Sequence, residues 1–211
     1  MLGDFDSFEY AIDLVNFQTK NDIKNLDIYL IAIGEENGKE KFCNYTNFPK
    51  ENLKVYPSNK LHNLVGASKG LDIGLGGWIN MTLMLMGIGS SKTIIEVVRG
   101  YTGDKDSNQI YSDSDQINLF NFFKFSGKLF GHTFGKGYLR PFELATFRLN
   151  NMIEIFKNWN DYMIETKYLP QRSCTFILDE NNNFKYKFIS KDILNYSKNM
   201  KEPLSFLSEY L

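Results

Sequence analysis

The spacing of apolar residues in the first third of the chain predicts strands that alternate with helices. A helix is expected over 7–19, where apolar side chains recur on one face: Phe8, Ala11, Ile12 and Val15. Leu26–Ile33 is dense in Ile and Leu, which predicts a strand buried on both faces. Helices over 37–47 and 58–66 are expected to flank a second short strand at 53–56. This alternation is typical of an α/β fold with a parallel sheet covered by helices.

Strand patterning returns only near the C-terminus. Cys174–Leu178 is an apolar strand, and 184–189 alternates as its hairpin partner beyond an Asp- and Asn-rich turn. A final helix is expected over 190–200. We therefore predict a single domain over 1–211.

Its core is formed by 1–67 and 166–211, and the stretch 68–165 is an insertion. This insertion is expected to be mostly helical, with one helix over about 91–99 and another from Pro141 to about Tyr162.

Composition and charge narrow the class of protein. The chain is 43 % hydrophobic and 15 % aromatic, which is sufficient for a buried core. Its formal net charge of −1 gives no reason to expect nucleic acid as a partner. No apolar run reaches the roughly 20 residues of a transmembrane helix, and no signal peptide is visible. With two cysteines, the expected location is the reducing cytoplasm.

Seven short segments carry a resemblance to a known family. Three lie in the predicted core: Phe42-Cys-Asn-Tyr-Thr-Asn-Phe-Pro49, Leu61-His-Asn-Leu-Val-Gly66 and Thr175-Phe-Ile-Leu-Asp179. The others are Gly3-Asp-Phe-Asp-Ser7, Arg99-Gly-Tyr-Thr-Gly-Asp104, Arg140-Pro-Phe-Glu-Leu-Ala-Thr146 and Pro203-Leu-Ser-Phe-Leu207. Together they resemble the peroxiredoxin-like (AhpC/TSA antioxidant) proteins of the thioredoxin-like superfamily, in the branch of oxygenic phototrophs and chloroplasts. The resemblance covers nearly the whole chain and implies a thioredoxin-like mixed sheet with flanking helices and a thiol-based antioxidant role.

Two parts that this resemblance implies are missing. Peroxiredoxins carry the attacking cysteine in a P-x-x-x-T-x-x-C turn, but the corresponding residues 1–10 offer Asp4, Asp6 and Ser7 instead. Asp6, followed by Glu9, is expected to cap the first helix. The first core strand, expected just upstream, is also absent, either because the chain starts beyond it or because the sheet has lost it. Since that strand would pair with both neighbours, we expect a gapped or collapsed sheet, or a partner segment in the slot.

Cys43 is the best candidate for a reactive thiol. If 37–47 is helical, Lys39 lies one turn before Cys43 and Lys41 is close, and positive neighbours favour the thiolate. Peroxide would then oxidise Cys43 to a sulfenic acid, which Cys174 as resolving thiol, or an external small-thiol or thioredoxin-type reductant, would restore. The alternative is that both cysteines are packing residues, because free cysteines are among the most buried residues.

The resemblance also makes Arg172 a candidate thiolate activator. The family arginine would fall at Ser173, so the Arg172 guanidinium is displaced by one position. No cofactor and no metal site are expected, because His62 and His132 are isolated and a metal site needs three or four patterned ligands.

Residues 116–142 interleave aromatic and basic side chains and contain no acid. The phenylalanines are Phe120, Phe122, Phe123, Phe125, Phe130 and Phe134, and the basic residues include Lys124, Lys128, Lys136 and Arg140. Such a segment either binds single-stranded nucleic acid or an anionic membrane surface, or packs its phenylalanines on the core. Two functions therefore stay open: a thiol-dependent peroxidase or oxidoreductase, and a non-catalytic thioredoxin-fold scaffold that binds a protein partner or a membrane surface through this segment.

Overall fold

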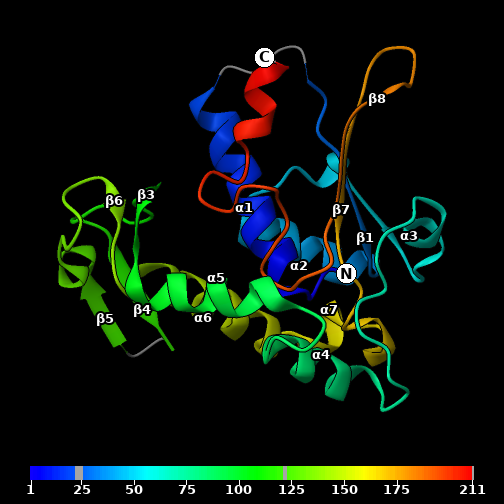
Figure 1. Cartoon of the computed structure of the whole chain (residues 1–211), viewed down its shortest axis with the longest axis horizontal. Helices are drawn as coiled ribbons and strands as arrows, with labels where there is room; N and C mark the ends of the chain where they lie inside the picture. Colours follow the sequence, from blue (N-terminus) through cyan, green and yellow to red (C-terminus); the bar gives the residue numbers. More distant parts are fainter. Residues whose placement is uncertain (22–25, 121–122, 211) are drawn as a thin grey trace.

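The computed structural model describes residues 1–21, 26–120 and 123–210 and has a mixed α/β architecture (Figure 1). The first part contains α1 (Phe5–Lys20), β1 (Leu30–Ile33), α2 (Glu36–Thr46), β2 (Leu53–Tyr56) and α3 (Lys60–Leu64). The insertion contains α4 (Gly77–Leu85), α5 (Ser91–Thr102), β3 (Asp104–Asn108), β4 (Gln116–Leu119), β5 (Phe123–Ser126), β6 (Tyr138–Leu139), α6 (Glu143–Lys157) and α7 (Trp159–Tyr162). The last part contains β7 (Cys174–Leu178), β8 (Phe184–Ile189) and a 3-10 turn at Ser205–Glu209.

The strands pair two by two. β1 and β2 are parallel, with Leu30 opposite Leu53 and Ile33 opposite Tyr56, whereas β7 and β8 form an antiparallel hairpin with a bulge near Leu178. β3 pairs with β6, and β4 with β5, both antiparallel. Within the described residues no ladder joins β1 with β7. The expected single mixed sheet of 26–33, 53–56, 174–178 and 184–189 is therefore not formed.

The start of the chain lies beside the end of β1. The backbone N–H of Leu2 donates to the carbonyl of Ile33 (2.9 Å), and the side chain of Leu2 is fully buried. Gly34 has no room for a side chain, because a Cβ there would lie 2.4 Å from the Leu2 side chain. Residues 1–2 therefore supply one rung next to β1, but not a strand between β1 and β7.

Two predicted elements are wrong. The final helix over 190–200 is an irregular, mostly buried segment, in which Leu194 has a left-handed φ of 57° and its N–H donates to the Asp6 carboxylate. A side chain distant in sequence thus replaces the helical hydrogen bond. The insertion is also not mostly helical, since four strands follow α5, and the predicted helix from Pro141 to Tyr162 divides at Asn158 into α6 and α7. In β4 and β5 the alternating apolar and polar residues, rich in phenylalanine, favour strands over helix.

The core joins the first part of the chain to the insertion. Phe8 on α1 is fully buried, and its ring contacts Phe42 and Tyr45 of α2 at centroid distances of 4.8 and 5.5 Å. The same ring lies 5.3 Å from that of Tyr162 on α7, in an edge-to-face arrangement. No helix in the described ranges is long and apolar enough to cross a bilayer.

Candidate functional site

Cys43 is a buried residue of α2. Its exposed fraction is 4 %, and it belongs to the hydrophobic core. Burial raises the pKa of the Cys43 thiol above its usual value, and the opposing charge of Lys39 is the smaller effect. Lys41 is held by Asp161, at 2.6 Å. Cys43 is therefore a neutral thiol near pH 7, which is a poor nucleophile.

Cys174 has the same character. It is the first residue of β7, it is half-buried, and burial raises its pKa as well. Both cysteines are free thiols. Neither has a thiolate-stabilising environment of the kind that reactive cysteines require.

Arg172 is buried against the beginning of α1. One terminal nitrogen lies 3.3 Å from Oδ2 of Asp6 and the other lies 3.4 Å from Oδ1 of Asp4. Its Nε donates to the carbonyl of Pro170, at 2.8 Å. The guanidinium thus lies at the turn where the resemblance places the attacking cysteine, but its partners there are two aspartates.

The sequence predicts that Asp6 caps α1, and this prediction is wrong. The N-cap position is Asp4, which makes no side-chain cap, and Asp6 accepts the N–H of Leu194 at 2.6 Å. Burial, followed by the charge of Asp4, raises the pKa of Asp6 to about 8. Asp6 therefore retains its proton near neutral pH.

A second group of buried charges links three helices. Arg148 of α6 holds Glu9 of α1 with two hydrogen bonds, of 2.7 and 3.0 Å, and reaches Glu96 of α5 at 3.1 Å. Arg99 of α5 pairs with the same Glu96, at 2.7 Å, and donates to Ser107 on β3. This arginine–glutamate network crosses from the core into the insertion.

A cleft of about 390 Å³ opens beside this network. Its walls are formed by α1, β3, the start of α6 and the segment 196–205. Asp13 of α1 lies in the cleft, where its Oδ2 accepts the hydroxyl of Tyr196 at 2.6 Å. Burial, and then the charge of Glu9, raises the pKa of Asp13 to about 7. A carboxyl group of such pKa in a concave site is a candidate for binding or proton transfer.

Sequence reasoning missed this cleft, although a signal was present. Glu9 and Asp13 are like charges four residues apart on one helix, an arrangement that is unfavourable unless a partner compensates it. Among the described residues, no group of three or more His, Cys, Asp or Glu side chains is placed to hold a metal ion.

The insertion also exposes many large apolar side chains, which we call together the insertion face. It comprises Trp78, Ile79, Met86, Ile94, Ile95, Val98, Tyr101, Phe120, Phe123, Leu129 and Phe134. Ile95 is 65 % exposed and Phe123 is 61 % exposed. Packing on the core is therefore wrong for Phe120, Phe123 and Phe134, whereas Phe125 and Phe130 are half-buried against each other. Phe122 lies outside the described residues.

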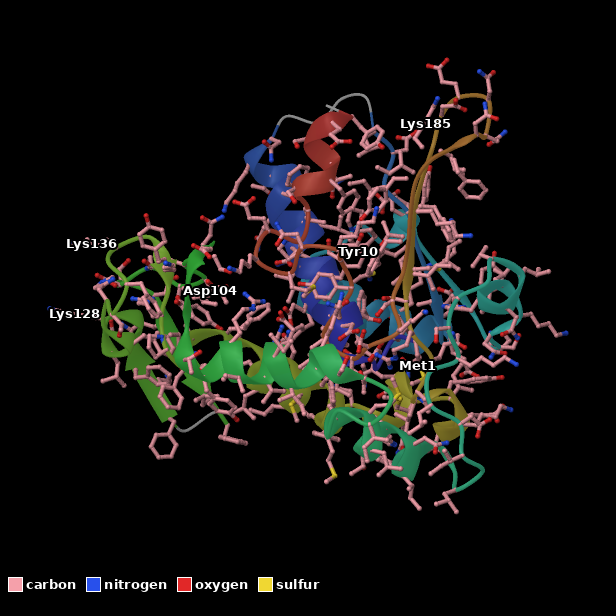
Figure 2. The ribbon with its side chains drawn as sticks, viewed as in Figure 1. Met1, Tyr10, Asp104, Lys128, Lys136 and Lys185 are labelled. Atoms are coloured by element: carbon pink, nitrogen blue, oxygen red, sulfur yellow. The ribbon has the colours of Figure 1, made fainter. Side chains whose placement is uncertain are left out.

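Among the described residues, the exposed charged side chains within 73–103 and 116–142 are lysines, and exposed aspartates flank these stretches at Asp72, Asp106, Asp113 and Asp115. From 73 to 103 the only fully exposed charged side chain is Lys92, because Glu96 is buried and Arg99 is partly buried. Lys124, Lys128 and Lys136 are exposed in the acid-free segment 116–142. Figure 2 shows Lys128 and Lys136 at the outer edge of the molecule, far from Met1 and Tyr10.

Comparison with known proteins does not add a relative: no family model, no curated protein and no solved structure matches this chain.

Proposed function

We propose that the chain is a peroxiredoxin-like, thioredoxin-related scaffold that lacks thiol peroxidase activity and binds an anionic membrane surface through the insertion face. The family assignment rests on the segment resemblance. The observation that carries the binding function is the insertion face itself, with its exposed aromatic and aliphatic side chains. Exposed apolar side chains that gather in a patch are typical of protein or membrane contact sites.

The chemistry of the insertion face favours a membrane over a protein partner. α5 is amphipathic, with Ile94, Ile95 and Val98 exposed on one side and Thr93 and Glu96 buried on the other. Trp78 and Tyr101 are aromatic residues with a polar group, the kind that is enriched at membrane interfaces. The exposed lysines of the segment 116–142 complement anionic lipid headgroups. The cytoplasmic location of the protein and a thiol reductant as its partner stay predictions from the sequence.

The absence of catalysis is tested at Cys43. Wild-type protein with dithiothreitol is expected to consume hydrogen peroxide no faster than dithiothreitol alone, and Cys43→Ser is expected to give the same rate. The reason is that burial raises the pKa of the thiol, so that little thiolate is present. Cys174→Ser serves as the matched control. A wild-type rate well above background that falls in Cys43→Ser would instead establish the thiol-dependent function.

Membrane binding is tested by reversing the exposed lysines. Wild-type protein is expected to sediment with vesicles of phosphatidylcholine and phosphatidylserine, and much less with phosphatidylcholine alone. The triple variant Lys124→Glu/Lys128→Glu/Lys136→Glu is expected to bind roughly 100-fold more weakly, at about 1 kcal/mol for each lysine.

The matched control carries the same charge change outside the insertion. Lys54, Lys60 and Lys185 are exposed there. Their triple replacement with Glu is expected to leave vesicle binding within about threefold of wild type, because the effect of a charge decays within a Debye length. Equal loss in both triple variants, or no sedimentation of wild type with anionic vesicles, contradicts the membrane proposal and leaves a protein partner as the alternative.

A further inference from the structure

We propose that the cleft between α1, β3 and the segment 196–205 binds a small organic cation, an alkyl or aryl ammonium, whose charged group lies against the carboxylate of Asp13. This site is independent of membrane binding by the insertion face. It follows from the shape of the cleft, from the side chains that line it and from the charges at its floor.

The cleft has the size and lining of a small-molecule site. Its volume of about 390 Å³ falls in the range of roughly 300–1,000 Å³ that is typical of ligand pockets. Apolar side chains cover much of the wall: Phe17, Ile110, Leu139, Leu144, Phe147, Met200, Pro203 and Leu204. A hydrocarbon or aromatic group would lie against these side chains, which leaves the polar groups to position a charged end.

The charges at the floor leave Asp13 without a cation. Arg148 is occupied by Glu9 and Glu96, through three hydrogen bonds to their carboxylates. Arg99 is occupied by Glu96 and Ser107. No lysine or arginine in the described part of the chain forms a salt bridge with Asp13, whose described partner is the Tyr196 hydroxyl.

That hydroxyl is itself shared. Tyr196 Oη lies 2.6 Å from Oδ2 of Asp13 and 3.1 Å from Oε1 of Glu9, but it has one proton to donate. The Oδ1 oxygen of Asp13 has no donor among the residues that the structure describes. An ammonium group carries three donors and one positive charge, so it supplies both the hydrogen bond and the counter-ion that Asp13 lacks.

The groups that face Asp13 set how its binding depends on pH. Glu9 on α1 disfavours its ionised form, whereas Arg148 on α6, Arg99 on α5 and the Tyr196 hydroxyl favour it. Burial is the largest effect and raises the pKa of Asp13 to about 7. Ionised Asp13 is the binding form, so ammonium affinity should fall as the pH decreases through 7.

Two lysines line the cleft, and neither forms a salt bridge with Asp13. Lys201 is paired with Asp106 at 2.5 Å. Lys20 is exposed at the last turn of α1, two turns beyond Asp13. Because water screens an exposed charge, Lys20 does not act as the counter-ion of Asp13.

The test uses three probes of one shape: benzylamine, benzyl alcohol and benzoate, each titrated calorimetrically into the full-length chain. Benzylamine is expected to bind at pH 8, and the two other probes at least tenfold more weakly. Between pH 8 and pH 5.5 the affinity for benzylamine should fall by roughly 30-fold, the change in the ionised fraction of a group with a pKa of about 7.

Asp13→Asn separates the carboxylate from the cleft shape. This variant is expected to bind benzylamine at least tenfold more weakly than wild type and to lose the pH dependence, while its far-UV circular dichroism stays that of wild type. Glu51→Gln, an exposed carboxylate outside the cleft, is the matched control and should bind as wild type. Equal affinity for the three probes, unchanged binding by Asp13→Asn or no binding of benzylamine at pH 8 would overturn the proposal.

Discussion

Replacing Arg172 with methionine is expected to lower the free energy of unfolding by about 3–5 kcal/mol. The guanidinium is buried, and it is the only arginine or lysine in the described ranges within salt-bridge distance of Asp4 and Asp6. Without it, the negative charge that this pair of carboxyl groups carries stays buried without its guanidinium partner, which is the costly case for a buried ion pair. Urea denaturation at pH 7, followed by circular dichroism, measures the loss.

The control for this prediction is an exposed ion pair. Lys185 lies 3.2 Å from Asp179 with about half of its side chain exposed, so Lys185→Met is expected to cost less than about 1 kcal/mol. A triple variant separates charge from packing. If Asp4→Asn/Asp6→Asn/Arg172→Met is not more stable than Arg172→Met alone, the uncompensated carboxylates are not the cause.

Local patterns predicted most of the elements near the ends of the chain. The helix over 7–19 appears as Phe5–Lys20, and the strand at 174–178 appears as Cys174–Leu178. Both were predictable because buried apolar residues recur with the period of a helix or a strand. The strand expected over 26–33 is shorter, at Leu30–Ile33. Residues 190–200 were mispredicted because the Asp6 carboxylate, nearly the whole chain away, takes the N–H of Leu194.

The candidate sites depend even more on contacts between distant residues. Lys39 does lie near Cys43, as helical spacing predicts, but burial has the larger effect on the thiol pKa, and spacing alone does not show burial. Arg172 reaches the N-terminal turn of α1 from 166 residues away, where it contacts Asp6. The cleft at Asp13 requires Tyr196, which is 183 residues distant. Only the like charges of Glu9 and Asp13 are visible locally.

Replacing Phe8 with alanine is expected to lower the free energy of unfolding by about 3–5 kcal/mol, the usual cost of removing a buried aromatic ring. The ring is fully buried between Phe42 of α2 and Tyr162 of α7. A cavity there weakens the core and the insertion together. If 1–211 is a single domain, as the sequence predicts, one cooperative transition should move to lower urea concentration.

Two probes report on the two parts of the chain. Trp78 and Trp159, stacked at 4.9 Å, are the two tryptophans and both belong to the insertion, so tryptophan fluorescence follows the insertion and its contact with residues 1–5. Far-UV circular dichroism also includes α1 and α2. In Phe8→Ala the two curves should coincide at one lowered midpoint. Phe184→Ala, at a site 63 % exposed, should lower the free energy of unfolding by less than about 1 kcal/mol. Separate midpoints would show that Phe8 does not couple the insertion to the core and that the chain folds as two units.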